Sequence, residues 1–397
     1  LFRSGNITLG GNFTGLQGAG LYATSSNAPA VLIDGGILTA GGGNIKIYGK
    51  CSGSYDDGIR LRGNITTSGS GNVELYGEAH GGNNGTNYFG GITFGTAAGS
   101  TIETENGNLI LDGYLTNTQS NSTGAINFYR MDGSTGQTNH INLLSKTGNV
   151  TVKADRGTTG AYGMGHSSWG HVYVGSPATG WTATGNVVFT YSSLVGAGYN
   201  GIKVKTTGSV TYEPVGASFA AAQVLPSNTN YVLAQGASSL TIGKTTNTAN
   251  IDITSALSIA GPITIYGGLL EIEDDISSTA GADITLSGSN GFYTSGSSAI
   301  QRDVTTSGGN ILIEADRDAN GVGTLNLDYL VVNPGSGNTI IRGEDYNWVT
   351  TSEATKPWVN GTGTFTLESN DASIGQNTDL IWFKIDQDAN GIAGLNL

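Results

Sequence analysis

Gly43-Asn44-Ile45-Lys46-Ile47-Tyr48 contains the pattern that decides the fold of this chain. A Gly-Asn pair is followed by a run in which apolar and polar residues alternate. Alternation with a period of two predicts a β-strand with one buried and one solvated face. The same phrase returns at residues 5–9, 71–76, 107–112, 148–152, 185–189 and 309–313. A recurring turn-plus-strand unit predicts stacked repeats rather than a single globular core.

The composition agrees with an ordered chain that is solvated without many charges. The 397 residues include 65 glycines and a single cysteine, and only 12% are charged while 37% are apolar. Globular domains carry roughly 25% charged residues, so Ser, Thr, Asn and Gly must cover this surface. The formal net charge of −13 disfavours nucleic acid and anionic membranes as partners. No stretch approaches the ~18 apolar residues of a spanning helix, so we expect no membrane insertion of this segment.

The repeated phrase predicts an all-β fold, a right-handed parallel β-helix with irregular loops. Strands of about three to five residues must pair with equivalent strands one coil away, at about 4.8 Å per step. Gly and Asn at the corners tolerate the positive φ of a sharp bend, and Asn stacked on Asn can form a hydrogen-bonded ladder. Ile, Val, Leu and Phe would fill the interior. A two-sheet sandwich is the competing architecture, but recurrence of a fixed phrase favours the solenoid.

The spacing of the strand signals divides the chain into three parts. Residues 1–214 read as solenoid repeats with longer loops, 215–235 as a linker or irregular coil, and 236–397 as repeats that continue beyond the chain end. The linker holds the one stretch of helical composition, Ala217–Leu225, which Pro226 ends. After it the predicted strands are closely spaced: Leu240–Ile242, Ile251–Ile253, Ile263–Ile265, Leu269–Ile272 and Ile284–Leu286.

Two acidic loops carry the sharpest chemical signal. Asp316-Arg317-Asp318-Ala319-Asn320-Gly321 recurs near the end of the chain as Asp386-Gln387-Asp388-Ala389-Asn390-Gly391. Alternating carboxylates before Asn-Gly resemble the first half of an EF-hand calcium loop, but Leu327 and Leu397 stand where its bidentate acid belongs. Calcium is the only cofactor these loops imply. The candidate ligands are Asp316, Asp318, Asn320, Asp386, Asp388 and Asn390. The alternative, which we favour, is an acidic turn whose Asp and Asn side chains bond their own backbone.

Catalytic constellations are weaker. The most site-like group is Tyr55, Asp56, Asp57, Arg60 and Arg62, because acids combined with arginine suit a glycan-cleaving site. A surface loop with balancing charges is the favoured interpretation. Glu271 and Glu273 share one strand face and read as solvated. The histidines, His80, His140, His166 and His171, lack a zinc-binding spacing. We therefore expect no enzymatic activity.

Aromatic residues suggest a different kind of site. Tryptophan and tyrosine rings can stack on sugar rings. In a narrow solenoid they more often form inner stacks or cover the loops. The tryptophans are Trp169, Trp181, Trp348, Trp358 and Trp382, of which Trp348 and Trp358 are expected to be displayed.

Three stretches of the second half carry a family resemblance: Leu240–Ala249 (LTIGKTTNTA), Ser258–Gly268 (SIAGPITIYGG) and Asn333–Gly343 (NPGSGNTIIRG). They resemble the giant repetitive surface proteins of gliding, Bacteroidetes-type bacteria and, more loosely, the filamentous-haemagglutinin adhesins. The resemblance is best from about residue 236 onward. It implies a right-handed β-helical, exported protein at the cell surface that serves adhesion, with a possible role in gliding motility.

The expected function is therefore a stalk or filament segment of an extracellular bacterial surface adhesin, and we read the chain as an internal or processed piece of a longer protein. Its expected partners are cell-surface or extracellular glycans or proteins. Two alternatives stay open. One is a β-helix enzyme acting on acidic polysaccharide, which needs a cleft with converging acidic and basic side chains. The other is self-association into fibres through exposed strand edges at the solenoid ends.

Overall fold

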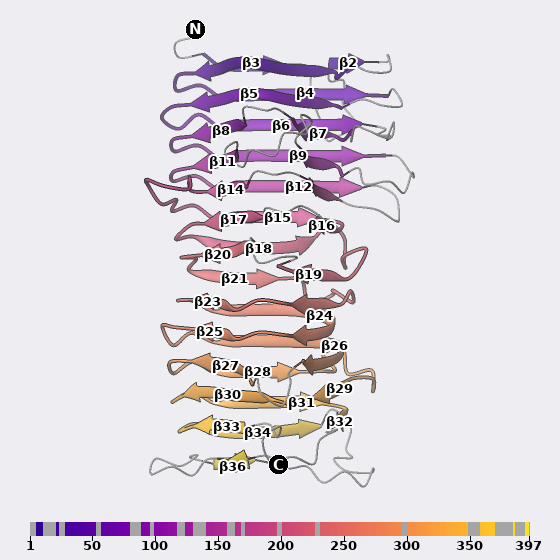
Figure 1. Cartoon of the computed structure of the whole chain (residues 1–397), viewed down its shortest axis with the longest axis vertical. Helices are drawn as coiled ribbons and strands as arrows, with labels where there is room; N and C mark the ends of the chain where they lie inside the picture. Colours follow the sequence, from indigo (N-terminus) through magenta and orange to yellow (C-terminus); the bar gives the residue numbers. More distant parts are fainter. Residues whose placement is uncertain are drawn as a thin grey trace. The chain divides into compact units, whose positions relative to one another are not determined.

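The protein is described from a computed structural model, in which residues 5–10, 21–23, 28–52, 57–79, 89–95, 99–116, 124–129, 140–156, 163–167, 171–196, 201–226, 231–295, 301–347, 358–369, 384–385 and 394–396 are placed. These residues form β-strands and turns without a helix. Every strand pairing among them is parallel, and each strand pairs with the equivalent strand one coil away (Figure 1). The predicted parallel β-helix is confirmed, and the sandwich is excluded.

The contacts between residues divide the chain into two compact units. The first comprises Leu1–Gly216 and Ser227–Gln235, and the second comprises Ala217–Pro226 and Gly236–Leu397. Residues 215–235, expected to be a linker or irregular coil, contain two strands. One of them, β19 (Gln223–Leu225), belongs to the second unit, and the other, β20 (Val232–Gln235), belongs to the first. The helical composition of Ala217–Leu225 gives bends and a strand, because Gln223 and Leu225 bury their side chains in the solenoid.

The first unit presents three faces of stacked strands. The first face consists of β1 (Ile7–Leu9), β2 (Leu21–Ala23), β4 (Ile45–Cys51), β6 (Val73–Ala79), β9 (Leu109–Leu115), β12 (Val150–Arg156), β15 (Val187–Tyr191) and β18 (Ser209–Pro214). The second consists of β7 (Ile92–Phe94), β10 (Ile126–Tyr129), β13 (Met164–Ser167) and β16 (Leu194–Gly196), and the third of β8 (Ser100–Thr104), β11 (Ile141–Ser145), β14 (Val172–Gly175), β17 (Ile202–Lys205) and β20. Two long strands, β3 (Val31–Ala40) and β5 (Ile59–Thr67), run across both of these faces.

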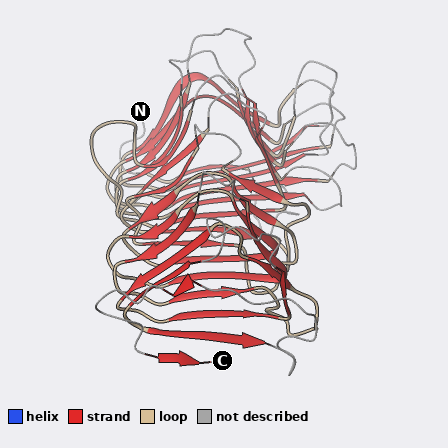
Figure 2. Cartoon of the chain, turned by 60° about the horizontal axis from the view of Figure 1, so that its bottom comes forward, coloured by secondary structure: helices blue, strands red, loops and turns tan. Residues whose placement is uncertain are grey.

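The second unit repeats this arrangement with different strands (Figure 2). Two of its faces share β24 (Ile263–Ile272) and β26 (Ile284–Thr294). The other strands of these faces are β19, β21 (Ser239–Ile242), β22 (Ile251–Ile253), β28 (Ile311–Glu314), β29 (Thr324–Asn326), β31 (Thr339–Gly343), β32 (Asp345–Asn347), β34 (Thr364–Ser369) and β36 (Gly394–Asn396). The third face consists of β23 (Leu257–Ile259), β25 (Ile276–Ser278), β27 (Arg302–Thr306), β30 (Leu330–Gly335), β33 (Trp358–Gly361) and β35 (Lys384–Ile385).

One strand boundary differs from the sequence prediction. The runs Ile263–Ile265 and Leu269–Ile272 read as two strands, but they form the single strand β24. Its first part pairs with β21 and its last part with β22, and its register with β26 shifts between Gly267 and Leu269. The Gly267-Gly268 pair lets one strand bend around a corner of the coil, where the sequence suggested a break.

The interior consists of aligned rows of apolar side chains, as the alternation predicts. In β9 and β12 every second residue is buried and the residues between are half-exposed. Because the strands pair in register, equivalent residues stack on one another: Ile47, Leu75, Leu111, Val152, Phe189 and Tyr212 form one row. At roughly 25 cal/mol per Å² of apolar area, such rows are the main source of stability.

The Gly-Asn pairs form the predicted ladder. In the first unit the side-chain Oδ1 of each Asn accepts a hydrogen bond from the backbone N–H one coil on, with N···O distances of 2.7–2.9 Å. The acceptors are Asn6, Asn44, Asn72, Asn108, Asn149 and Asn186. In the second unit Asn250, Asp283, Asn310 and Asn338 accept equivalent bonds. The ladder fixes the register between neighbouring coils.

The reason for the glycine in this phrase differs from the one expected. Gly43, Gly71, Gly107, Gly148 and Gly185 do not have a positive φ. Instead, a Cβ at any of them would overlap the carbonyl oxygen of the equivalent glycine one coil earlier. The glycines are required because the backbones of successive coils approach closely at this corner, not because the chain turns left-handed there.

Candidate functional site

The acidic loop at Asp316 makes the hydrogen bonds of a self-contained turn. The Asp316 carboxylate is buried and accepts bonds from the backbone N–H groups of Asn320 (3.1 Å) and Gly321 (3.3 Å). The Asn320 side chain donates to Asp318 and accepts from the N–H of Val322. This geometry is that of the acidic turn that we favoured. Calcium binding by Asp316, Asp318 and Asn320 stays a prediction, and Asp386, Asp388 and Asn390 lie outside the described residues.

Arg317, between the two acids, connects several coils of the second unit. Its guanidinium donates to the carbonyl oxygens of Thr245 (2.8 Å), Asn247 (2.7 Å), Gly267 (3.2 Å) and Ser287 (2.6 Å). It also lies over the ring of Tyr266, 5.5 Å from the centroid. A planar group with five donors is suited to bind carbonyls of several strands at once. The loop thus has a structural role that its acidic pattern did not indicate.

The cluster around Asp57 proves to be a buried ion pair. Asp57 is fully buried, and one carboxylate oxygen accepts from Arg60 at 2.5 Å. The other accepts from the N–H of Gly90 at 2.9 Å and the hydroxyl of Thr93 at 2.5 Å. Burial raises the pKa of Asp57, and Arg60 and these donors oppose that rise. The Asp57 carboxylate is thus inaccessible to solvent and bonded on both of its oxygens. Tyr55 and Asp56 lie outside the described residues.

Arg62 has a different environment from Arg60. It lines a pocket of about 440 Å³ on the outer surface of the first unit, together with Asn64, Thr101, His140 and Asn142. Gly35, Gly36, Ile37, Gly63, Gly99 and Ser100 complete the lining. We call it the corner pocket.

Glycine backbone shapes the corner pocket. β5 passes from the second face to the third at this point, and the register of β3 on β5 shifts between Asp34 and Ile37. Gly35 has a φ of +62°, and a Cβ at Gly63 would lie 2.5 Å from the carbonyl oxygen of Gly36. Side chains at these positions would fill the corner, so glycine leaves the space open.

A row of outward side chains, polar apart from Ile37, crosses the third face from the pocket. Strand register places Ile37, Asn64, Thr101, Asn142, Tyr173 and Lys203 next to one another on successive coils. Asn64 Oδ1 accepts from the N–H of Thr101 at 2.9 Å, and Asn142 Nδ2 donates to the Thr101 hydroxyl at 3.1 Å. These bonds hold the two amide side chains in fixed orientations.

His140 and His171 lie beside this row. The sequence pattern did not mark them as candidate site residues. The rings of His140 and His171 stack with centroids 5.6 Å apart, and His140 meets Tyr173 edge to face at 5.1 Å. His140 Nδ1 accepts from the backbone N–H of His171 at 3.3 Å. Burial, reinforced by Lys203, lowers the pKa of both histidines. A signal was available, since both histidines directly precede alternating runs, His140-Ile-Asn-Leu and His171-Val-Tyr-Val.

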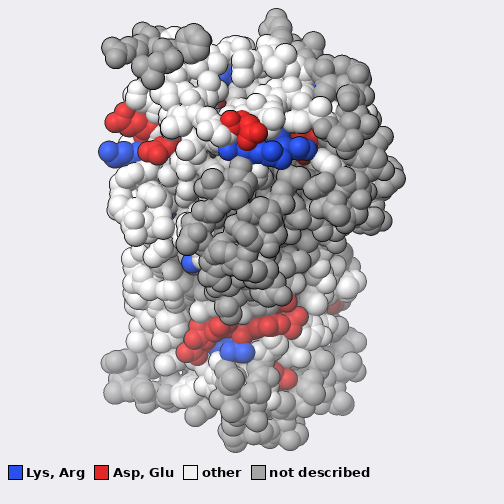
Figure 3. Space-filling model, turned by 45° about the horizontal axis from the view of Figure 1, so that its top comes forward, with Lys and Arg blue, Asp and Glu red and all other residues white. Residues whose placement is uncertain are grey.

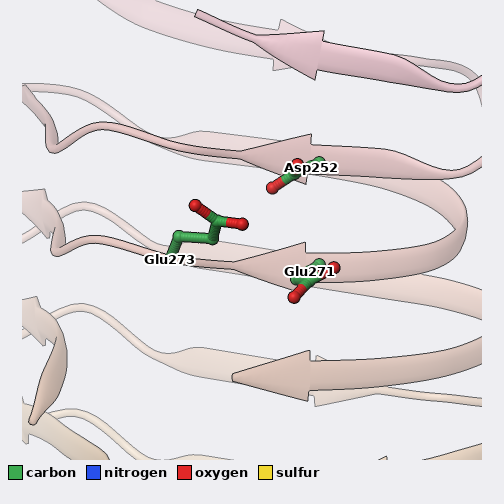
Figure 4. A group of neighbouring side chains, drawn as sticks. All are labelled: Asp252, Glu271 and Glu273. Atoms are coloured by element: carbon green, nitrogen blue, oxygen red, sulfur yellow. The ribbon is translucent and has the colours of Figure 1, made fainter. Parts of the chain in front are cut away.

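An acidic cluster lies on the second unit. Asp252 on β22 is opposite Glu271 on β24, and Glu273 follows on the same face (Figure 4). One carboxylate oxygen of each lies within 4.8 Å of the others. Burial raises the pKa of Asp252 to about 6, and repulsion from Glu273 and Glu271 adds to that rise. Such carboxylates can hold a divalent cation. All three side chains are half-exposed, which is equally typical of the solvated face predicted for Glu271 and Glu273.

Charged side chains are sparse in this chain, of which they make up 12%. Figure 3 shows that charged side chains on the face in view gather in a few patches, with most of the described surface uncharged.

Two of the tryptophans lie among the described residues. Trp181 is half-exposed, and so is Trp358 on β33 opposite Val331. Trp169, Trp348 and Trp382 lie outside the part of the chain that is described.

Within that part, no helix has the length and apolar character needed to cross a bilayer. No model of a known protein family, no curated protein and no solved structure matches this chain.

Proposed function

We propose that the chain is a stalk or filament segment of an extracellular bacterial adhesin, of the kind represented by the giant repetitive β-helical surface proteins that its second half resembles. The observation that carries the proposal is the Asn ladder. The same bond joins coil to coil through each unit, so each unit grows by adding equivalent coils. A repeat protein of this type suits projecting a binding surface, because each coil is stabilised by its neighbours and length costs little stability.

The uncharged, polar surface supports an extracellular scaffold. Only 12% of the residues are charged, and several of these form ion pairs between coils, such as Lys46–Glu74 and Arg342–Glu368. Partners would be glycans or proteins of other surfaces, and chains could also associate with one another into fibres. Fibre formation would use the unpaired strand edges that every open solenoid has at its ends.

An enzyme acting on acidic polysaccharide is the second candidate, and one observation favours it. Arg62 lines the corner pocket, and its guanidinium lies 3.8 Å from the carboxylate of Asp34. Glycosidases need two carboxyl groups converging on one bond, about 5 to 9.5 Å apart. Asp57, the acid of the predicted cluster that the described residues include, is instead buried against Arg60. This assignment of Asp57 supports the scaffold over the enzyme.

Two measurements test the proposal. Antibodies against the chain should label intact cells of the source organism as strongly as permeabilised ones, and beads coated with the chain should adhere under flow to polysaccharide-coated glass. Beads coated with an unrelated β-rich protein are the control. Label seen only after permeabilisation would contradict the proposal. Release of soluble oligosaccharide from polygalacturonate or alginate incubated with the chain would favour the enzyme.

A further inference from the structure

The corner pocket has the size and the lining of a small-molecule site. Its volume of about 440 Å³ falls within the range of roughly 300–1,000 Å³ typical of ligand pockets. It is open at the outer surface of the first unit, and its walls come from four successive coils. Such a position is accessible to one end or one side branch of a long polymer as well as to a small molecule.

The polar groups of the pocket are pre-oriented by bonds to the protein. Asn64 uses its Oδ1 and Asn142 its Nδ2 in the row across the third face. Among the described residues no bond is made by the Asn64 Nδ2 or the Asn142 Oδ1, so these atoms can meet a ligand. Because His140 Nδ1 accepts from His171, a neutral His140 carries its proton on Nε2. One donor amide, one acceptor carbonyl and one imidazole donor are thus fixed before any ligand binds.

Mixed donors and acceptors match hydroxyl groups, which donate and accept at once. The side chain of Ile37, which is 69% exposed, and the ring of His140 add apolar surface to the same pocket. A sugar ring has both features, hydroxyls around its rim and C–H groups on its faces. The lining therefore fits a saccharide better than a purely apolar or a purely ionic ligand.

The charges decide the class of saccharide. Arg62 is the one guanidinium that lines the pocket among the described residues, and the carboxylate of Asp34 lies beside it. The depressed pKa keeps His140 uncharged at neutral pH. The chain as a whole carries a net charge of −13, which repels polyanions at low ionic strength. An uncharged sugar meets no such repulsion.

We propose that the corner pocket binds uncharged sugar residues of a glycan, with Asn64, Asn142 and His140 bonding their hydroxyls and Ile37 contacting a ring face. The inference rests on the adhesive part of the proposed function and names its ligand class. It places glycan recognition on the strand face of the solenoid itself.

The test is calorimetric titration of the full chain with a panel of soluble glycans. The uncharged members are xylan, mannan and mixed-linkage β-glucan oligosaccharides, and the acidic members are oligogalacturonate and oligoalginate. We expect at least one uncharged member to bind with a dissociation constant of about 1 mM or tighter. Asn142→Ala and His140→Ala should each weaken that binding about tenfold or more.

Thr151→Ala is the matched control, since Thr151 is an outward residue of β12, on the first face and away from the pocket. Its binding should equal that of the parent chain. Ile37→Arg gives an independent check, because Ile37 is exposed and a long side chain there obstructs the pocket without disturbing the core. The Ile37→Arg variant should also weaken sugar binding. Circular dichroism and melting of each variant establish that it is folded.

Three outcomes would overturn the inference: no binding across the panel, binding by acidic members alone, or binding that Asn142→Ala, His140→Ala and Ile37→Arg leave unchanged. Failure here is distinct from failure of the proposed function. Surface labelling and bead adhesion can succeed while soluble sugars do not bind, in which case adhesion uses another surface. Conversely, the chain could bind sugars while antibodies label only permeabilised cells. The inference about the pocket would then stand, and the proposed adhesin function would fail.

Discussion

At the scale of single residues, the glycine of the repeated phrase is decided by contact between coils. Gly107 is buried, and a Cβ there would overlap the carbonyl of Gly71. Local turn geometry does not require glycine at this position, since its φ is not positive. The sequence showed that a glycine recurs, but only the stacked coils show what each glycine avoids.

Gly107→Ala should therefore destabilise the first unit, by roughly 1–3 kcal/mol as expected for overpacking. Gly42→Ala is the matched control. Gly42 is exposed, and a Cβ there meets no atom within 4 Å. Denaturant unfolding followed by circular dichroism compares the two. Equal midpoints for both variants would show that the coils separate enough to admit a methyl group at little cost.

Asp252 gives a prediction about pH. Its pKa in the folded chain is raised to about 6, above the ~3.9 of an unfolded Asp. The folded state therefore holds this proton more tightly, so stability should fall as pH rises from about 4 through 6 and stay lower above that. Asn at this position carries no charge and removes the effect.

Asp252→Asn should accordingly raise the melting temperature at pH 7.5 and leave it nearly unchanged at pH 4. The gain is on the order of 0.5 kcal/mol, because the group is half-exposed and solvent screens the repulsion. Thermal melts in the presence of a chelator measure it. A variant that melts lower than the parent at pH 7.5 would mean that the carboxylate makes a favourable contact that outweighs its repulsion by Glu271 and Glu273.

At the scale of elements, strand alternation and the Asn ladder together set the register. Alternation alone would allow a strand to slip by two residues and keep its buried face. The ladder bond at the start of each strand removes that freedom. Asp283 takes the same position as the asparagines and accepts a bond of 2.7 Å from the N–H of Asn310. The ladder thus requires a side-chain acceptor, not specifically an amide.

Asn149→Ala should cost about 0.5–1.5 kcal/mol, near the lower limit because this bond is exposed to water. Asn149→Asp should retain most of that stability, since it keeps the acceptor, as Asp283 does in the second unit. Chemical denaturation of both variants measures the difference. If Asn149→Asp loses as much stability as Asn149→Ala, a charged acceptor cannot replace the amide and the ladder depends on asparagine at this position.

At the scale of the whole molecule, stability in each unit is a sum of neighbouring contacts. Arg317 is an exception, because one side chain bonds carbonyls from residues 245 to 287 and so spans several coils. Its bonds are charge-assisted and partly buried, which makes them stronger than neutral ones.

Arg317→Gln should lower hydrogen-exchange protection across β21, β24, β26 and β28 together, by a factor of about ten or more per amide, since several such bonds contribute roughly 1.5–3 kcal/mol each. Strands β6, β9 and β12 of the first unit should exchange as before, because solenoid coupling is between neighbours. Arg302→Gln is the control, because among the described residues the Arg302 side chain makes one hydrogen bond, from its Nε to the carbonyl of Ser295. A uniform loss in both units would mean that the chain unfolds as one cooperative body.

The sequence by itself determined the fold class, the inward and outward faces and most strand positions. Those properties follow from alternation with a period of two, which a few consecutive residues are enough to show. The sequence also indicated that the Asp316 loop is an acidic turn whose side chains bond its own backbone, because such hydrogen bonds form within a few residues.

Only the tertiary structure decided which residues meet across coils. Rungs of the same ladder are 28, 36, 41 and 37 residues apart, so no fixed period in the sequence aligns one coil with the next. The corner pocket, the triad of Asp252 with Glu271 and Glu273, and the burial of Asp57 all depend on that alignment. Loop lengths set which residues of successive coils face one another, and side chains of distant residues then lie within a few ångströms of one another.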